Sequence, residues 1–369
     1  MMRVLHVGKF YPPHPGGIER VVETLCQSSR GLVENHVLVA NASRETIQEV
    51  LDGVSVTRVG TIGAAGSVHI APAFASWLRR IPADLMVLHE PNPWALLSYA
   101  IARPAAPLFV WYHSDVVRPA LQYALFYAPM ARFVYGRARR IIVSSPALAR
   151  HAAALAPYQD RVRVIPFGID PAAWAVAAET PGHEPFLLFA GRHVGYKGVD
   201  VLLRALAGGG ARAVIAGDGP KRAEWERLSR DLGLNGRVTF TGEVSDAELH
   251  RLMRACAVLV LPSVTQAEAF GYVQLEAMAS GKPVISTDVA SGVSWVNQHQ
   301  RTGLIVPAGD AAALGGAIDR LMGDGALRAA LGAGGRARVE EEFTMGRLRE
   351  RLRLLYEEAA VVPPWPAAC

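Results

Sequence analysis

The sequence predicts an α/β protein with two doubly wound domains, each built on a parallel sheet. The chain has 369 residues, which is too long for one ordinary hydrophobic core. Short apolar runs alternate with helical patterns along most of the chain, and this alternation is typical of parallel sheets. The alternation is lost over residues 171–184 and then restarts. The loss and restart predict a linker between the domains.

Residues 1–170 are predicted to form the first domain. Its expected strands are short apolar runs, at Arg3–Val7, His36–Ala40, Val54–Val59, Leu85–His89, Leu108–Tyr112, Ile141–Ser144 and Val162–Pro166. Its expected helices lie between those runs, at Gly17–Ser29, Ala71–Arg80, Trp94–Ala102, part of Pro119–Arg139, and Pro146–Ala154. Each strand except the last is therefore followed by a helix or a connection of similar length.

Residues 185–345 are predicted to form the second domain. Its strands are expected at Phe186–Ala190, Ala213–Ala216, Val238–Thr241, Val258–Leu261, Val284–Ser286 and Gly303–Val306. Helices are expected at 199–207, 220–232, 246–255, 272–280, 310–322 and 325–342. A last helix should cover 346–360, and residues 361–369, with three prolines, should form a loose tail.

Composition excludes several classes of protein. The first residues form a short apolar run interrupted by His6, unlike a signal peptide, and no stretch approaches the roughly 20 apolar residues of a membrane span. The three cysteines show no paired spacing, so we expect a reducing, cytoplasmic setting and no metal site. The net charge is +5, but we find no nucleic-acid-binding signature.

Two glutamates stand out in the second domain. Glu268 follows the strand that starts at Val258, and Glu276 lies early in the next helix, with Gly271 giving the backbone room to turn between them. On one continuous helix a spacing of eight would put the two acids on different faces. With a loop between them, both can reach the edge beyond the carboxyl end of the strand, where open α/β sheets bind ligands. The alternative is a solvated helix with two ordinary surface acids.

This spacing, followed by Ala-Met-Ala-Ser-Gly-Lys-Pro-Val-Ile, resembles the signature of glycosyltransferase family 4 (glycosyl transferases group 1). The resemblance extends over nearly the whole chain. It implies a GT-B fold, with two Rossmann-like domains facing a cleft and a C-terminal helix that crosses back to the first domain. It also implies that Glu276 holds the nucleotide ribose and Glu268 the sugar hydroxyls. Phe270, Gly271 and Val244 are expected at the same donor site.

Two cations follow the first strand of the second domain, in Gly191-Arg192-His-Val-Gly-Tyr-Lys197-Gly198. The leaving group of a nucleotide-sugar carries two phosphates, and fixed cations stabilise the charge that develops as the sugar departs. The alternative is a pair of surface cations. The pattern is similar to the family's diphosphate clamp, so Arg192 and Lys197 are our candidates.

The first domain should supply two further elements. Gly16 and Gly17 open a helix, so their backbone can approach a diphosphate or an acceptor oxygen, although a tight turn alone would also need glycines. His113 ends a strand, where an imidazole can exchange a proton or offer its dipole. The alternative is a buried histidine bonded to backbone. In the family a histidine here contacts the transferred sugar, and Asp115 is a candidate for the group that orients it.

The resemblance implies a metal-independent, retaining hexosyltransferase without a cofactor. Ser291–Gln298 is similar to a subgroup that transfers mannose or related sugars, such as rhamnose, from GDP-sugars in O-antigen and exopolysaccharide synthesis. The expected partners are a nucleotide-sugar donor and a lipid-linked or glycan acceptor, with no nucleic acid. Front-face substitution is the expected route.

Other functions remain open from the sequence. A nucleotide-sugar epimerase or hydrolase, and a non-catalytic sugar-nucleotide-binding partner, share this architecture. A dehydrogenase would need a Gly-x-Gly-x-x-Gly fingerprint, which neither half shows.

Residues 116–150 carry six arginines and no acid, with apolar residues between them. This composition predicts either a patch that rests on an anionic membrane or a core helix with solvated arginines. A patch of that kind would place the enzyme on the inner face of the plasma membrane.

Overall fold

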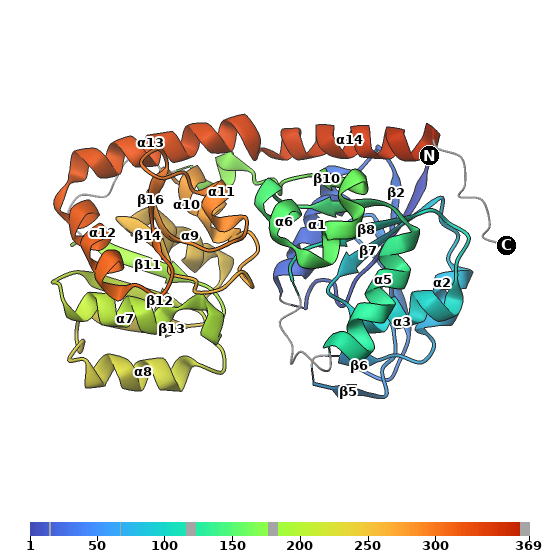
Figure 1. Cartoon of the computed structure of the whole chain (residues 1–369), viewed down its shortest axis with the longest axis horizontal. Coiled ribbons are helices and arrows are strands. Elements are labelled where there is room, and N and C mark those ends of the chain that lie inside the picture. The colour runs from blue at the N-terminus through green and yellow to red at the C-terminus, as the bar shows by residue number, and fades with distance from the viewer. Residues whose placement is uncertain (15, 67, 116–122, 176–183, 362–369) are drawn as a thin grey trace. The chain divides into compact units, whose positions relative to one another are not determined.

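The computed structural model describes the chain except for residues 15, 67, 116–122, 176–183 and 362–369. The chain forms two compact units (Figure 1). The first comprises Met1–Phe167 and the C-terminal segment from Gly346, and the second comprises Gly168–Met345. Each unit has a central, mainly parallel sheet, so the predicted α/β class with two doubly wound domains is confirmed.

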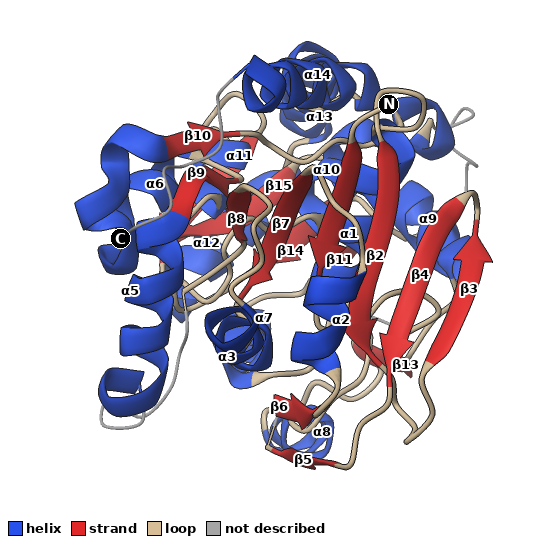
Figure 2. Ribbon diagram, turned by 90° about the vertical axis from the view of Figure 1, so that its right-hand side faces the viewer, coloured by secondary structure: helices blue, strands red, loops and turns tan. Residues whose placement is uncertain are grey.

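The sheet of the first unit has eight strands in the order β10-β9-β8-β7-β1-β2-β4-β3 (Figure 2). Its strands are β1 (Arg3–Val7), β2 (Glu34–Ala40), β3 (Ile47–Leu51), β4 (Val54–Val59), β7 (Leu85–Glu90), β8 (Leu108–Tyr112), β9 (Ala138–Val143) and β10 (Val162–Val164). A separate hairpin joins β5 (Gly63–Ala65) and β6 (Val68–Ile70). All pairs in the main sheet are parallel except β3 with β4. The carboxyl ends of the parallel strands therefore share one edge.

The helices of the first unit follow these strands. They are α1 (Gly17–Ser28), α2 (Phe74–Arg80), α3 (Pro93–Ala102), α5 (Ala128–Arg137), α6 (Pro146–His151) and α14 (Met345–Val361), with a π-helical turn at Tyr123–Tyr127 and a 3-10 segment at Ala153–Arg161. Val22 and Cys26 of α1 pack on the valines of β2 and β4. No helix among the described residues is long and apolar enough to cross a membrane.

The antiparallel strand β3 was not predicted from the sequence. It pairs with β4 through a two-residue turn, in which Asp52 and Gly53 have φ values of 50° and 80°. Such turns need positive φ at both central residues, and Asp-Gly is a preferred pair for them. The strand is mostly exposed, with Val50 at 69%, so it lacks the alternation of buried residues by which strands are recognised.

The second unit has a six-stranded parallel sheet in the order β13-β12-β11-β14-β15-β16. Its strands are β11 (Phe186–Ala190), β12 (Arg212–Ala216), β13 (Val238–Gly242), β14 (Val258–Leu261), β15 (Val284–Asp288) and β16 (Gly303–Pro307). Its helices are α7 (Val199–Ala207), α8 (Arg222–Asp231), α9 (Asp246–Ala255), α10 (Val273–Ala279), α11 (Val293–Val296), α12 (Ala311–Gly323) and α13 (Gly325–Glu342). A core of aliphatic residues and Trp225 joins the sheet to α7, α8 and α12.

Part of the segment expected as a linker belongs to the second unit. Pro171–Trp174 forms a 3-10 turn, and Trp174 is buried with its ring 3.9 Å from that of His250. Ile169 also bonds to Phe343 of the same unit, its N–H donating to the carbonyl oxygen over 2.7 Å. The unit therefore begins at Gly168, and the rest of the expected linker, 176–183, lies outside the described residues.

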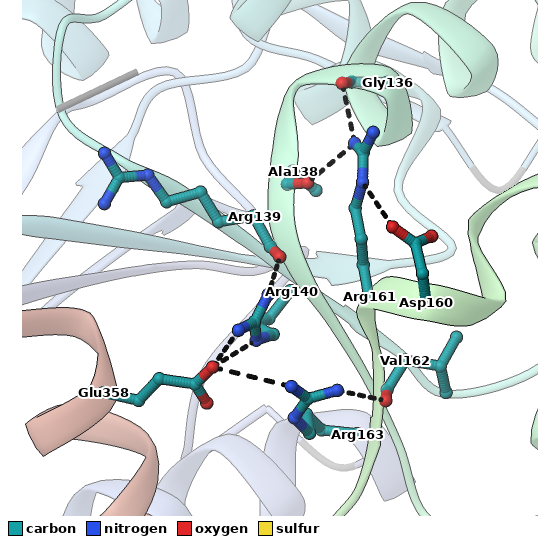
Figure 3. Close-up of polar contacts among 9 residues, drawn as sticks. All are labelled: Gly136, Ala138, Arg139, Arg140, Asp160, Arg161, Val162, Arg163 and Glu358. Atoms are coloured by element: carbon teal, nitrogen blue, oxygen red, sulfur yellow. Dashed lines mark hydrogen bonds and ion pairs between the residues drawn. The ribbon is translucent and has the colours of Figure 1, made fainter. Parts of the chain in front are cut away.

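The C-terminal helix α14 is held to the first unit by arginines (Figure 3). Glu358 Oε1 accepts a hydrogen bond from Arg140 Nε over 2.7 Å and forms an ion pair with Arg163 at 3.6 Å. Arg349 donates to the carbonyl oxygens of Ser28 and Arg30, both over 2.8 Å. The chain thus returns to its first unit, as the resemblance implied.

These contacts correct one part of the membrane hypothesis. Arg140 is paired with Glu358, an acid more than 200 positions away in the sequence, and Arg139 is buried at 6% exposure. Neither is a free surface cation. Arg137 stacks its guanidinium 4.1 Å from the ring of Phe133 and is exposed, as is Arg132. Arg118 lies outside the described residues.

Candidate active site

Four loops of the second unit meet at the carboxyl edge of its sheet. They follow β11, β12, β13 and β14, which are neighbours in the sheet. Backbone hydrogen bonds join the loops: His193 N–H donates to Asp218 O, Gly217 N–H to Gly242 O, and Val264 N–H to Tyr196 O, each over 2.8 Å. The loops that carry the predicted donor-site residues are therefore one bonded assembly at the edge where open α/β sheets bind ligands.

Glycines allow this close approach. Gly198 has φ of +66°, and a Cβ there would lie 2.1 Å from the carbonyl oxygen of Pro262, at the end of β14. Gly217 has φ of +118°, and its Cβ would lie 2.1 Å from the carbonyl oxygen of Gly191. At both positions only glycine fits, so the loop after β11 is clamped between the ends of β12 and β14.

The packing of the loop after β11 brings two predicted site residues together. Lys197 Nζ lies 2.6 Å from Glu268 Oε2, and the side chains are 12% and 10% exposed. Ser263 Oγ donates to the same carboxylate oxygen over 3.1 Å. Burial by itself lowers the pKa of Lys197, but the charges of Glu268 and Tyr196 and the hydrogen bond to Glu268 outweigh it and raise that pKa. The site therefore holds a nearly buried ammonium and carboxylate as an ion pair.

The other predicted donor-site residues lie on the same loops or just after them. Arg192 is exposed on the loop after β11, and Val244 is half-buried after β13. Phe270 is buried, and Gly271 has φ of +71° where the chain turns into α10. Glu276 lies in the first turn of α10 at 3% exposure. Glu268 and Glu276 thus sit on a loop and on the following helix, as predicted.

The first unit carries the remaining predicted residues. Gly16 precedes α1, and a Cβ there would lie 1.9 Å from Glu19 Oε2, so the Glu19 side chain covers Gly16, while Gly17 has no such neighbour. His113 follows β8 and is 6% exposed, and its backbone N–H donates to Glu90 O over 2.9 Å. His113 directly follows β8, whereas Gly16 and Gly17 lie where the connection from β1 enters α1.

The hypothesis that Asp115 orients His113 is wrong. Asp115 Oδ1 accepts a hydrogen bond from the Tyr112 hydroxyl. The ring of His113 instead bonds through Nε2 to Nδ1 of His89, over 3.0 Å. Sequence reasoning missed His89 because it lies inside a strand, where a single histidine gives no signal until the strand order is known.

Comparisons with known proteins identify the family. The model for "Glycosyltransferase Family 4" matches residues 15–173, and that for "Glycosyl transferases group 1" matches residues 173–338. The O-antigen chain mannosyltransferase C of Escherichia coli is 32% identical over 96% of this chain and 98% of its own length. The D-rhamnosyltransferase WbpZ of Pseudomonas aeruginosa is 33% identical, over 93% and 92%. The chain belongs to glycosyltransferase family 4.

Solved structures agree on the fold of this family 4 glycosyltransferase. The sucrose-phosphate synthase of Thermosynechococcus elongatus superimposes with a TM-score of 0.82, at 24% identity, covering 97% of this chain and 99% of its own. HepE of Anabaena, in complex with UDP and glucose, gives a TM-score of 0.75 at 21% identity, covering 97% and 100%. The GT-B fold expected from the sequence is therefore confirmed.

The packing of the loop after β11 can be tested by comparing two glycines. Gly198→Ala and Gly233→Ala both put a side chain at a positive φ, +66° and +69°, but only the first meets a neighbouring atom within 4 Å. We expect Gly233→Ala to lower the free energy of unfolding by about 1–2 kcal/mol. Gly198→Ala should cost about 1–3 kcal/mol more because of the clash with Pro262. Urea unfolding measures both, and equal losses would contradict the packing described here.

Proposed function

We propose that this glycosyltransferase moves a hexose, mannose or a related sugar, from a nucleotide-diphosphate sugar to a glycan acceptor, with retention of configuration. The nearly buried pair of Lys197 and Glu268 carries the proposal. An ammonium and a carboxylate at 2.6 Å offer one group for phosphate and one for sugar hydroxyls, at the sheet edge where ligands bind. The mannosyl- and rhamnosyltransferase relatives favour a GDP-linked donor and a role in cell-surface polysaccharide synthesis.

In this proposal Arg192 and Lys197 bind the diphosphate, and Glu268 releases its ion pair in part to accept sugar hydroxyls. Glu276 takes the ribose, while Val244, Phe270 and Gly271 line the donor site. His113 contacts the transferred sugar, and Gly16 and Gly17 approach the phosphates or the acceptor. Because burying a charge without a partner is costly, Glu268 holds the ammonium in place until a phosphate arrives.

The proposed reaction keeps the new bond on the face from which the old one leaves. The bond between the anomeric carbon and the phosphate oxygen breaks, and the acceptor oxygen bonds to the same face of that carbon. The acceptor's hydroxyl proton passes to the departing phosphate oxygen, so neither a covalent carboxylate nor a cofactor is needed. The two cations stabilise the charge that develops on the phosphates, which is the part a metal ion plays in other transferases.

We further propose a lipid-linked saccharide as the acceptor, reached from the cytoplasmic face of the membrane. Leu125 and Phe126 are 60% and 68% exposed just before α5, and Arg132 and Arg137 are exposed on that helix. Apolar side chains beside cations suit a surface that rests on anionic lipid. This revised patch replaces Arg139 and Arg140, which the fold uses internally.

Activity and donor choice can be tested together. Incubation with GDP-mannose and a polyprenyl-diphosphate-linked saccharide should give a mannosylated lipid whose anomeric configuration, read by NMR, equals that of the donor. GDP should also raise the unfolding temperature more than UDP, ADP or dTDP, because a nucleotide that binds the folded state stabilises it by mass action. Free or epimerised sugar formed without acceptor would instead favour the hydrolase or the epimerase.

Lys197→Ala should lower turnover by on the order of 10²-fold, because the ammonium acts on the phosphates as they depart. Lys221→Ala is the matched control: Lys221 lies on the next loop and forms an ion pair with the exposed Glu224, at 2.5 Å. Steady-state kinetics at saturating donor measure both, with circular dichroism to confirm that each variant folds. Unchanged turnover for Lys197→Ala would remove this residue from the diphosphate site.

Membrane binding should depend on the exposed apolar residues and arginines in and just before α5. Leu125→Ser with Phe126→Ser, or Arg132→Ser with Arg137→Ser, should reduce sedimentation with liposomes rich in anionic lipid. Each arginine near such a surface contributes about 1 kcal/mol, and the attraction should fade at high salt. Val50→Ser, at an exposed apolar residue of β3, is the control. A wild-type protein that stays in the supernatant throughout would end the membrane proposal.

A further inference from the structure

Three buried histidines of the first unit are hydrogen bonded in a row. His6 Nδ1 lies 3.0 Å from His89 Nε2, and His89 Nδ1 lies 3.0 Å from His113 Nε2. Their exposures are 0%, 1% and 6%. The register pairs His6 with Val87 and His89 with Trp111, so each step crosses to the next strand and advances two residues. The row therefore runs diagonally from the interior of the sheet to the carboxyl edge at His113.

Asn35 of β2 stands at the inner end of this row. Its Nδ2 donates to Cys26 O over 3.2 Å and to Ser29 Oγ over 2.9 Å, which turns Oδ1 away from those groups. Asn35 Oδ1 and His6 Nε2 are both buried, and neither has a hydrogen-bond partner within the described part of the chain. Burial is the larger effect and lowers the pKa of His6, while the Asn35 side chain raises it. Asn35 Nδ2 has two N–H groups and both are already used, so the atom that Asn35 can offer to His6 is its oxygen, which only accepts, and we place the ring proton on Nε2.

The three imidazoles are neutral at neutral pH. Burial lowers the pKa of His6 to about 4 and that of His113 to about 3, and burial together with its two neighbours lowers the pKa of His89 well below 6.5. A neutral imidazole has one N–H and one acceptor nitrogen. Each hydrogen bond in the row must therefore join the N–H of one ring to the acceptor nitrogen of the next.

The position of the ring proton on His6 therefore determines which nitrogen carries the proton in His89 and in His113. With Nε2 of His6 protonated, its Nδ1 accepts, so His89 donates from Nε2. His89 Nδ1 then accepts, so His113 donates from Nε2. The second nitrogen of His113, Nδ1, is left with its lone pair.

We propose that Asn35, His6 and His89 are positioning residues that hold His113 in the tautomer whose Nδ1 is a hydrogen-bond acceptor. On the function proposed above, on which this step rests, His113 Nδ1 then accepts a hydrogen bond from a hydroxyl of the transferred sugar instead of donating one to it. If the histidines only filled the core, the tautomer of His113 would not depend on that of His6. The two views therefore differ in a measurable property of His113.

The tautomer can be read from long-range ¹H–¹⁵N spectra of the ¹⁵N-histidine-labelled protein without donor. His113→Gln assigns the signals by their loss. In the wild type, Nε2 of His113 should show the shift of a protonated nitrogen and Nδ1 that of an acceptor. In His6→Phe, the N–H of His89 would lose its acceptor, and a buried N–H without a partner is costly. The protons of His89 and His113 should then both move to Nδ1.

His36→Phe is the control, because His36 lies on β2 and bonds to Thr57 Oγ1 over 2.9 Å, outside the row. It should leave the His113 signals unchanged. A wild-type His113 protonated on Nδ1 overturns the proposal, and so does an unchanged tautomer in a folded His6→Phe. If His6→Phe does not fold, the wild-type spectrum still decides. Since no donor is present, this result and the transferase assay can fail independently.

Discussion

Parallel strand pairing is the constraint on which both units depend. It directs the carboxyl ends of the parallel strands to one edge of each sheet, so loops that are distant in sequence meet there. In the second unit the loops after β11 and β14 are separated by about sixty residues, yet Gly198 packs against Pro262. That contact lets Lys197 reach Glu268. The functional pair is thus a consequence of strand order and of one position without a side chain.

The candidate residues of both units include buried groups that prefer water. The carboxylate of Glu268 raises the pKa of the buried Lys197 ammonium, whereas burial lowers the pKa of His6, His89 and His113 and keeps these rings neutral. In the proposed reaction, the first arrangement keeps a cation available to a phosphate. The second would then keep an imidazole that does not repel a developing positive sugar carbon. Burial therefore disfavours the charged form in both units, and only at Lys197 does a counter-charge outweigh it.

The local signals in the sequence were strong where one motif lies within one element and its loop. The positions of Arg192, Lys197, Glu268 and Glu276 relative to their strands and helices could all be predicted. The sequence did not predict the partner of a side chain when that partner lies far away along the chain. Arg140 looked unopposed until Glu358 of α14 was placed beside it, and Asp115 looked closer to His113 than His89, which the strand order puts next to it.

The sequence by itself determined the family, the fold class and the loops that carry the predicted donor-site residues, because apolar periodicity and motif spacing are local properties. Only the tertiary structure decided which charges are paired, which arginines are internal and how His113 is held. Those outcomes depend on strand order, register and burial, which bring residues together across tens to hundreds of positions. The order of residues along one chain does not by itself say which distant residues come into contact.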